Sequence, residues 1–140
     1  MAVRTEKIKL NKLGLNKTVS VRMTMGQFDR LEELGIQLLE QEKNQIENID
    51  NLTALDRMLA ERHARSVMFG FLQEVFSLTE EDIETIKDKI DPIQFQEGFS
   101  YVSDRMRGVT DKEYEQALKA EKELRDEQED PKKGSGESAV

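Results

Sequence analysis

Residues 67–76 read VMFGFLQEVF, and seven of these ten positions are apolar. The stretch continues a helical pattern in which Leu52, Leu55 and Leu59 share a face, so we expect one long helix over residues 52–76. A helix that is apolar around most of its circumference is buried in its own fold or covered by a partner. This stretch therefore predicts the centre of the core.

The segments that follow carry the start and stop signals of two further helices. Thr79 precedes an acidic turn, so it is expected to cap a short helix that ends near Ile90. Asp91 followed by Pro92 starts the next helix, because proline is tolerated at a first helical position. Gly108 ends it. The apolar residues of this helix are spaced as a single stripe, which comprises Phe95, Phe99, Val102 and Met106.

A charge-dense helix and a polar tail close the chain. Thr110 and Glu113 have the spacing of a capping box, which predicts a helix over residues 111–128. Residues 129–140 lack the apolar content that a fold requires, so they are expected to form a flexible tail. The sequence thus predicts a globular domain over residues 1–110, a charged helix and a tail.

The residues before the long helix predict a strand pair and a further helix. Residues 7–10 and 18–23 alternate apolar and polar side chains, as strands with one buried face do. Thr24 and Gln27 then mark the capped start of a helix that ends in the forties. The predicted fold is α+β and predominantly α, with a short N-terminal strand pair, about five helices and a disordered C-terminal tail.

Composition limits the classes of function. Apolar and charged residues each make up 36% of the 140 residues, the net charge is −8, and there is no cysteine. No apolar run approaches the roughly 20 residues that span a bilayer. The N-terminus has no signal-peptide pattern. We therefore expect a cytoplasmic protein without a membrane partner.

No residue pattern in the sequence points to catalysis. His63 is the only histidine, and it lies within a helix beside two arginines, as a helix-surface residue would. The acidic run at residues 79–84 lacks the spacing of a calcium loop and is explained by a helix start. Phosphate-binding loops and zinc-ligand spacings are absent from the sequence. We expect no catalytic residues, no metal and no cofactor, and hence a protein that is not an enzyme.

Candidate residues for binding a partner lie on the two most apolar predicted helices. Such a short chain has difficulty covering all of its large apolar side chains, and those left exposed mark interaction surfaces. The candidates are Val67, Phe69, Phe71, Phe76, Phe95, Phe99, Val102 and Met106.

Residues 18–35, TVSVRMTMGQFDRLEELG, resemble the opening of ribbon-helix-helix DNA-binding domains. In that family a strand pairs with its twin from a second chain and enters the major groove. The resemblance implies that Thr18, Ser20 and Arg22 contact base edges. Under this alternative the chain is a DNA-binding regulator or plasmid accessory protein, and nucleic acid is its partner.

The layout of the whole chain is similar to that of the tail assembly chaperones of long-tailed bacteriophages. The shared features are a strand pair, a capped helix, an apolar helix, a short acidic-capped helix, a stripe helix closing in RGVTDKEYE and a charged end; they cover residues 7–10, 18–23, 27–34, 67–76, 78–90 and 107–115. The resemblance implies a non-enzymatic chaperone of tail morphogenesis that binds the tape-measure protein and tail-tube subunits and forms homo-oligomers.

The same resemblance carries two further expectations. The protein would act in the host cytoplasm and be absent from the mature virion. In that family a minor fraction of the product arises by a translational frameshift near the end of the gene. Lys132 and Lys133 can be encoded by codons on which ribosomes slip.

Overall fold

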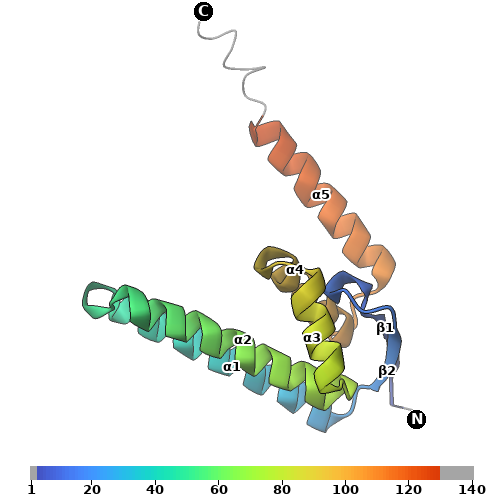
Figure 1. The fold of residues 1–140 in the computed structure, drawn as a ribbon. Helices are drawn as coiled ribbons and strands as arrows, with labels where there is room; N and C mark the ends of the chain where they lie inside the picture. Colours follow the sequence, from blue (N-terminus) through green and yellow to red (C-terminus); the bar gives the residue numbers. More distant parts are fainter. Residues whose placement is uncertain (1–2, 130–140) are drawn as a thin grey trace, which may run out of the picture. The chain divides into compact units, whose positions relative to one another are not determined.

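A computed structural model of the chain describes residues 3–129 and divides the protein into two units, Met1–Arg107 and Gly108–Val140. The first unit holds a two-stranded antiparallel sheet and four α-helices, and the second holds a fifth α-helix (Figure 1). The predicted α+β, predominantly helical fold is confirmed. Of the tail expected over residues 129–140, all but Glu129 lies outside the described residues. Independent folding of residues 1–110 stays a prediction.

The two strands form a hairpin within one chain. β1 (Thr5–Lys9) pairs antiparallel with β2 (Thr18–Arg22), with Ile8 opposite Val19. One face of the hairpin is buried through Ile8 and Val21, whereas alternate side chains on β2 are exposed. The connection contains a short 3-10 helix (Asn11–Leu13) and then turns at Gly14, whose φ of 86° favours glycine.

A long helical hairpin follows the strands. α1 (Met25–Glu47) and α2 (Ala54–Phe76) run side by side in opposite directions and are joined through a 3-10 turn (Ile49–Asn51) (Figure 1). The expected end of α1 in the forties is confirmed.

The predicted capping box of α1 forms only in part. The Thr24 hydroxyl accepts a hydrogen bond from the Gln27 backbone N–H at 3.2 Å. The Gln27 side-chain oxygen accepts instead from Arg30, and the Thr24 N–H donates to the Arg22 carbonyl.

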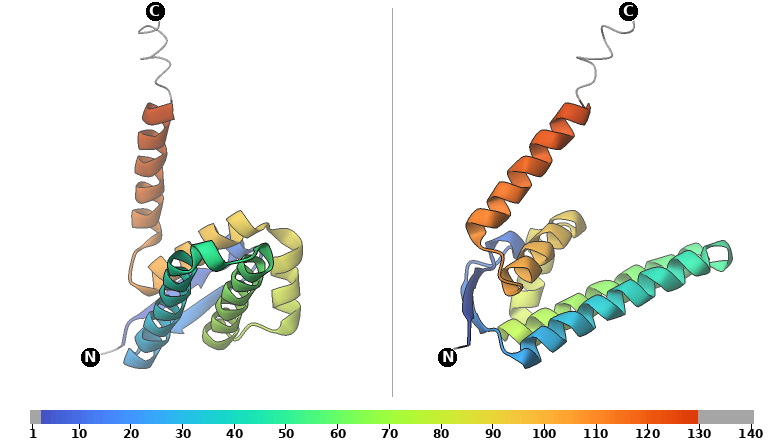
Figure 2. Two further views of the ribbon diagram at one scale, coloured as in Figure 1. Left: turned by 90° about the vertical axis from the view of Figure 1, so that its left-hand side faces the viewer. Right: turned by 180° about the vertical axis from the view of Figure 1, so that it is seen from behind.

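Two shorter helices complete the first unit. α3 (Glu80–Lys89) and α4 (Pro92–Met106) each begin with a full capping box, at Thr79 and Asp91. They pack across the end of the α1–α2 hairpin nearest the strands, as Figure 2 shows from two sides. The core lies there, since the inner faces of α2 are buried from Met68 to Phe76. The buried residues that other elements contribute to the core include Ile8, Leu13, Ile86, Val102 and Met106. The prediction that residues 67–76 form the centre of the core is confirmed in part: Met68, Phe71, Leu72, Val75 and Phe76 are buried, whereas Val67 and Phe69 are half-buried.

A buried arginine joins the last turn of α4 to the first strand. One Arg105 nitrogen donates to a Glu6 carboxylate oxygen at 3.0 Å and the other to the Lys7 carbonyl at 2.8 Å. The Glu6 carboxylate also pairs with Arg4, whose second nitrogen donates to the Met106 carbonyl. Burial raises the pKa of Glu6, but the hydrogen bonds from Arg4 and Arg105 outweigh it and hold that pKa below its ordinary value.

A close approach between α4 and the strand connection depends on Gly98. A Cβ atom built at this position lies 2.7 Å from the Lys12 carbonyl oxygen and 2.8 Å from a Leu13 methyl carbon. The first neighbour is backbone, so it has little freedom to move away. At Gly70, near the middle of α2, a Cβ atom meets nothing within 4 Å. The close helix approach in this fold is therefore at Gly98.

Gly98→Ala is expected to destabilise the protein by about 1–2 kcal/mol, because overpacking outweighs the gain in helix propensity. Gly70→Ala is the matched control and is expected to stabilise by about 0.5–1 kcal/mol, since it adds only helix propensity. Urea titrations followed by circular dichroism measure both changes. A Gly98→Ala variant as stable as Gly70→Ala would contradict the packing described here.

The second unit contains α5 (Asp111–Glu129). Its start has the predicted capping box, because the Thr110 hydroxyl accepts from the Glu113 N–H and the Glu113 carboxylate accepts from the Thr110 N–H, both at 3.1 Å. These bonds lower the pKa of Glu113. Residues 115–128 are exposed throughout. The predicted charged helix over residues 111–128 therefore forms, and its side chains are exposed apart from that of Tyr114, which is buried.

Candidate functional site

The outer part of the α1–α2 hairpin, residues 36–67, is called the arm here. Between Leu34 and Met68 no side chain is buried, although both helices are continuous over this stretch. Space remains between the two helices of the arm, including a cavity of about 360 Å³ beside Leu38, Gln41 and Ala60. The Gln41 side-chain amide donates across it to the Ala60 carbonyl. The arm therefore has no core of its own.

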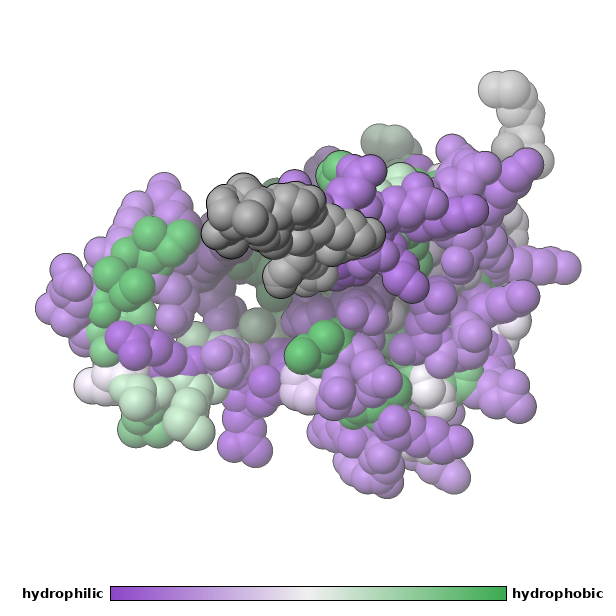
Figure 3. All heavy atoms as spheres, turned by 90° about the horizontal axis from the view of Figure 1, so that it is seen from above, coloured by the Kyte–Doolittle hydropathy of each residue, from purple (hydrophilic) through white to green (hydrophobic). Residues whose placement is uncertain are grey.

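The arm exposes an unusual number of large apolar side chains. Each helix of the arm carries its exposed apolar residues on one face, at the spacings that helices use to pack against one another. The set is Ile36 (47% exposed), Leu39 (66%), Ile46 (64%), Leu55 (63%), Met58 (66%) and Leu59 (53%), with Ile49 (56%) in the connecting turn. Figure 3 shows hydrophobic side chains gathered at the far end of the hairpin. Apolar surface of this kind marks a site of interaction.

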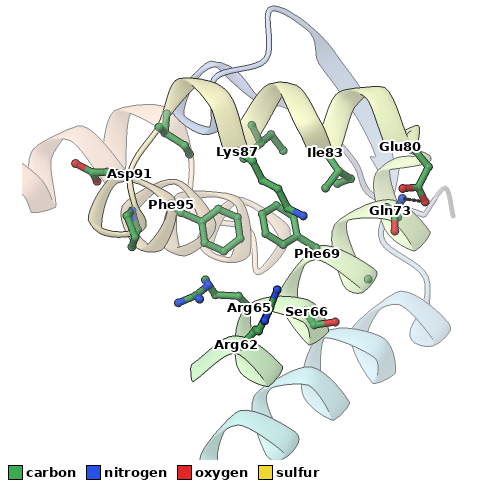
Figure 4. A pocket seen from close by; sticks show the side chains of 14 residues that line it. Arg62, Arg65, Ser66, Phe69, Gln73, Glu80, Ile83, Lys87, Asp91 and Phe95 are labelled. Atoms are coloured by element: carbon green, nitrogen blue, oxygen red, sulfur yellow. Dashed lines mark hydrogen bonds between the residues drawn. The ribbon is translucent and has the colours of Figure 1, made fainter. Parts of the chain in front are cut away.

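A groove of about 680 Å³ lies between α2, α3 and α4 at the base of the arm, whose Arg62, Arg65 and Ser66 line it (Figure 4). Its floor is apolar, with Ile83 and Ile86 buried and Phe69 stacked on Phe95 at 4.7 Å between ring centroids. The Lys87 ammonium lies 5.4 Å from the centre of the Phe69 ring. Phe69 itself is half-buried, so a ligand in the groove would reach its ring.

Three cationic side chains flank this floor. Arg62 and Arg65 come from α2 on one wall, and Lys87 comes from α3 on the other (Figure 4). The acidic groups of the groove lie near its ends and have local partners: Glu80 accepts from Gln73 at 3.4 Å, and Asp91 caps α4. The middle of the groove is therefore positively charged on a protein whose net charge is −8.

Six of the eight predicted partner-binding residues are buried in the structure. Buried residues of this set are Phe71, Phe76, Phe95, Phe99, Val102 and Met106. They pack against one another, for example Phe71 on Phe99 at 5.9 Å. On the folded surface a partner reaches only Val67 and Phe69, which are half-buried. Partner binding through the eight residues stays a prediction, and six of them are buried in the free chain.

Sequence reasoning missed the arm because a helical period does not show which apolar face is covered. The usable signal was the polar run at residues 40–51, which interrupts the hydrophobic pattern and places a turn far from the core. It also missed the positive groove, since Arg62 and Arg65 lie on α2 and Lys87 on α3.

The residues of the DNA-binding alternative are exposed, as that alternative required. Thr18, Ser20 and Arg22 alternate with the buried face of β2. However, β2 pairs with β1 of its own chain, whereas the alternative needs it to pair with a second copy of itself. The N-terminal hairpin is therefore accounted for as part of the first unit.

Within residues 3–129, His, Cys, Asp and Glu side chains form no group of three that would hold a metal ion. In the same range, no helix has both the length and the apolar character needed to cross a bilayer. His63 is exposed on the arm beside the space between its helices, as its sequence context predicted.

The exposed apolar faces of the arm mark a site of interaction with another molecule. The chain belongs to the phage tail assembly chaperones, because the family model of phage tail assembly chaperone proteins matches residues 6–123. That match covers the strand pair, the arm, the groove and most of α5. The curated proteins searched contain no match to the chain, and neither do the solved structures.

Proposed function

We propose that this chain holds the tape-measure protein and tail-tube subunits of its phage while the tail is assembled. The support is its family together with the arm, whose exposed apolar faces have no partner within the described residues. A tape-measure protein is long and helical, so before assembly it exposes apolar seams. A helix of the client lying against the arm would bury apolar surface on both partners.

The second part of the proposal concerns the solubility of the complex, which depends on charge. The net charge of −8 and the exposed acidic α5 would keep a complex with an apolar client in solution. The proposed mechanism has no chemical step, so the protein acts by binding alone. It would act in the host cytoplasm, self-associate and leave before the virion matures. A frameshifted longer product, expected from Lys132 and Lys133, belongs to the same proposal and lies outside the described residues.

Co-expression with the tape-measure protein tests the proposal. The tape-measure protein of the same phage is expected to be insoluble alone and to become soluble and co-purify when this chain is present. The matched control is co-expression with the chain carrying Leu55→Glu and Leu59→Glu on the arm. A tape-measure protein that is equally soluble with and without the chain, and does not co-purify, would overturn the proposal.

A further inference from the structure

The arginines of the α2–α3–α4 groove have no anionic partner within residues 3–129. Neither Arg62 nor Arg65 forms an ion pair or hydrogen bond through its side chain with any residue among 3–129. Both line the groove near the half-buried Phe69 ring, which stacks on Phe95. An arginine beside an aromatic floor, with its guanidinium unpaired, is suited to a carboxylate carried on an apolar surface.

The exposed face of α5 has the complementary arrangement. Leu118 and Leu124 are 42% and 58% exposed, and they lie three residues on either side of Glu121. Residues three apart share a helix face, so the apolar edge of α5 carries a carboxylate at its centre. Glu121 has no ion pair with any described residue. Residues 111–130 contain nine acidic and four basic groups, so the helix as a whole is attracted to a cationic groove.

We propose that the groove binds α5 of a second copy of this chain. Glu121 of that helix pairs with Arg65 and Arg62, while Leu118 and Leu124 cover the exposed part of the Phe69 ring. The pairing satisfies charges on both surfaces and buries apolar area that each leaves exposed. It names the surfaces for the self-association included in the proposed function, and it concerns the chain without any client.

The contact has a structural consequence because its two halves are different surfaces. A contact between unlike surfaces is heterologous, so after the first pairing one copy still has a free helix and the other still has a free groove. Copies then add in series, unless two of them exchange helices and close into a dimer. A series of copies matches the geometry of a long helical client, along which a repeating chaperone would lie.

Sedimentation velocity of the purified full chain tests the proposal. The weight-average mass is expected to rise above that of the 16.2 kDa monomer with increasing concentration, and to fall with added salt. Arg65→Glu alone and Glu121→Arg alone are each expected to weaken association about tenfold or more. The two substitutions combined in one chain restore a pair of opposite charges, so association is expected to return.

Arg57→Glu is the matched control, since it makes the same charge change on an exposed part of α2 outside the groove and is expected to leave association unchanged. Circular dichroism verifies that each variant is folded, and Arg62→Glu replaces any Arg65 variant that is not. A chain that stays monomeric up to about 200 μM would overturn the proposal. A dissociation constant of that size corresponds to a binding free energy of only about 5 kcal/mol, which the proposed contact should exceed. Failure of the combined variant to recover association would also overturn it. Either result leaves client binding by the arm unaffected.

Discussion

Replacing Arg105 with alanine is expected to lower the free energy of unfolding by about 3 kcal/mol. The guanidinium is buried, and it bonds both the Glu6 carboxylate and the Lys7 carbonyl. Its removal leaves a carboxylate that is only 16% exposed with Arg4 as its remaining partner, and a Lys7 carbonyl without this hydrogen bond. Because these bonds join α4 to β1, the strand pair is expected to detach first. Urea unfolding followed by circular dichroism measures the loss.

Arg107→Ala is the matched control for this substitution. Arg107 is 53% exposed, and its contact with Asp104 at 3.9 Å lies within the same helix end, so its loss is expected to cost less than about 0.5 kcal/mol. Arg105→Lys is expected to recover only part of the stability, because an ammonium does not reproduce the two-pronged geometry of the guanidinium. Equal stability of the Arg105→Ala and Arg107→Ala variants would show that the buried pair has no structural role.

The same substitution changes the dependence of stability on pH. The folded protein lowers the pKa of Glu6 from its ordinary 4.5, so the ionised carboxylate stabilises the fold above that pH. This contribution is lost as the pH falls through the lowered pKa. In the Arg105→Ala variant the ionised Glu6 carboxylate contributes less to stability at neutral pH, because one of its two cationic partners is gone. The difference in stability between wild type and variant is therefore expected to shrink below about pH 4.

The largest effect on binding is expected from two substitutions on the arm. Leu55→Glu combined with Leu59→Glu should weaken the complex with a helical client about 100-fold or more. Burial of a leucine side chain contributes about 1.5–3 kcal/mol, and a carboxylate at an apolar contact opposes binding further. Both leucines are more than half exposed in the free chain, so its stability is expected to change little. Titration of a labelled tape-measure segment measures the affinity.

The control for the arm makes the same change in net charge without removing an apolar side chain. Lys43→Gln combined with Arg57→Gln lowers the net charge by two, as the two glutamates do, and both positions are exposed on the arm. This variant is expected to bind the client within about threefold of wild type, since surface charges contribute less than about 1 kcal/mol each. Similar affinities for the two double variants would show that charge, rather than the apolar face, governs binding.

Local signals predicted most of the helices. Thr79, Asp91 and Thr110 each start a helix with a capping box in the structure, because these bonds form between residues three apart and are legible in the sequence. The alternation on β2 likewise predicted its buried face, with Val21 inside and Arg22 outside. The apolar run at residues 67–76 predicted the core for the same reason, since no other stretch is as uniformly apolar.

Long-range contacts were beyond the reach of these signals. The ion pair between Glu6 and Arg105 spans 99 residues, and the clash that excludes a side chain at Gly98 comes from the Lys12 carbonyl. Neither has a local pattern. The same limit explains why most of the predicted partner-binding residues are buried. Periodicity showed that Phe95 and Phe99 share a stripe. Only the fold shows that the inner end of α2 covers this stripe, whereas the apolar faces of the arm stay exposed.

Hydrogen–deuterium exchange of the full chain, with and without a soluble segment of the tape-measure protein, tests the central claim most directly. Without a core, the arm is expected to exchange quickly in the free chain, because few buried contacts oppose its local opening. Binding is expected to slow exchange over residues 36–67, with little change in α4. Unchanged exchange in the arm, at client concentrations that saturate binding, would contradict the claim that the arm holds the client.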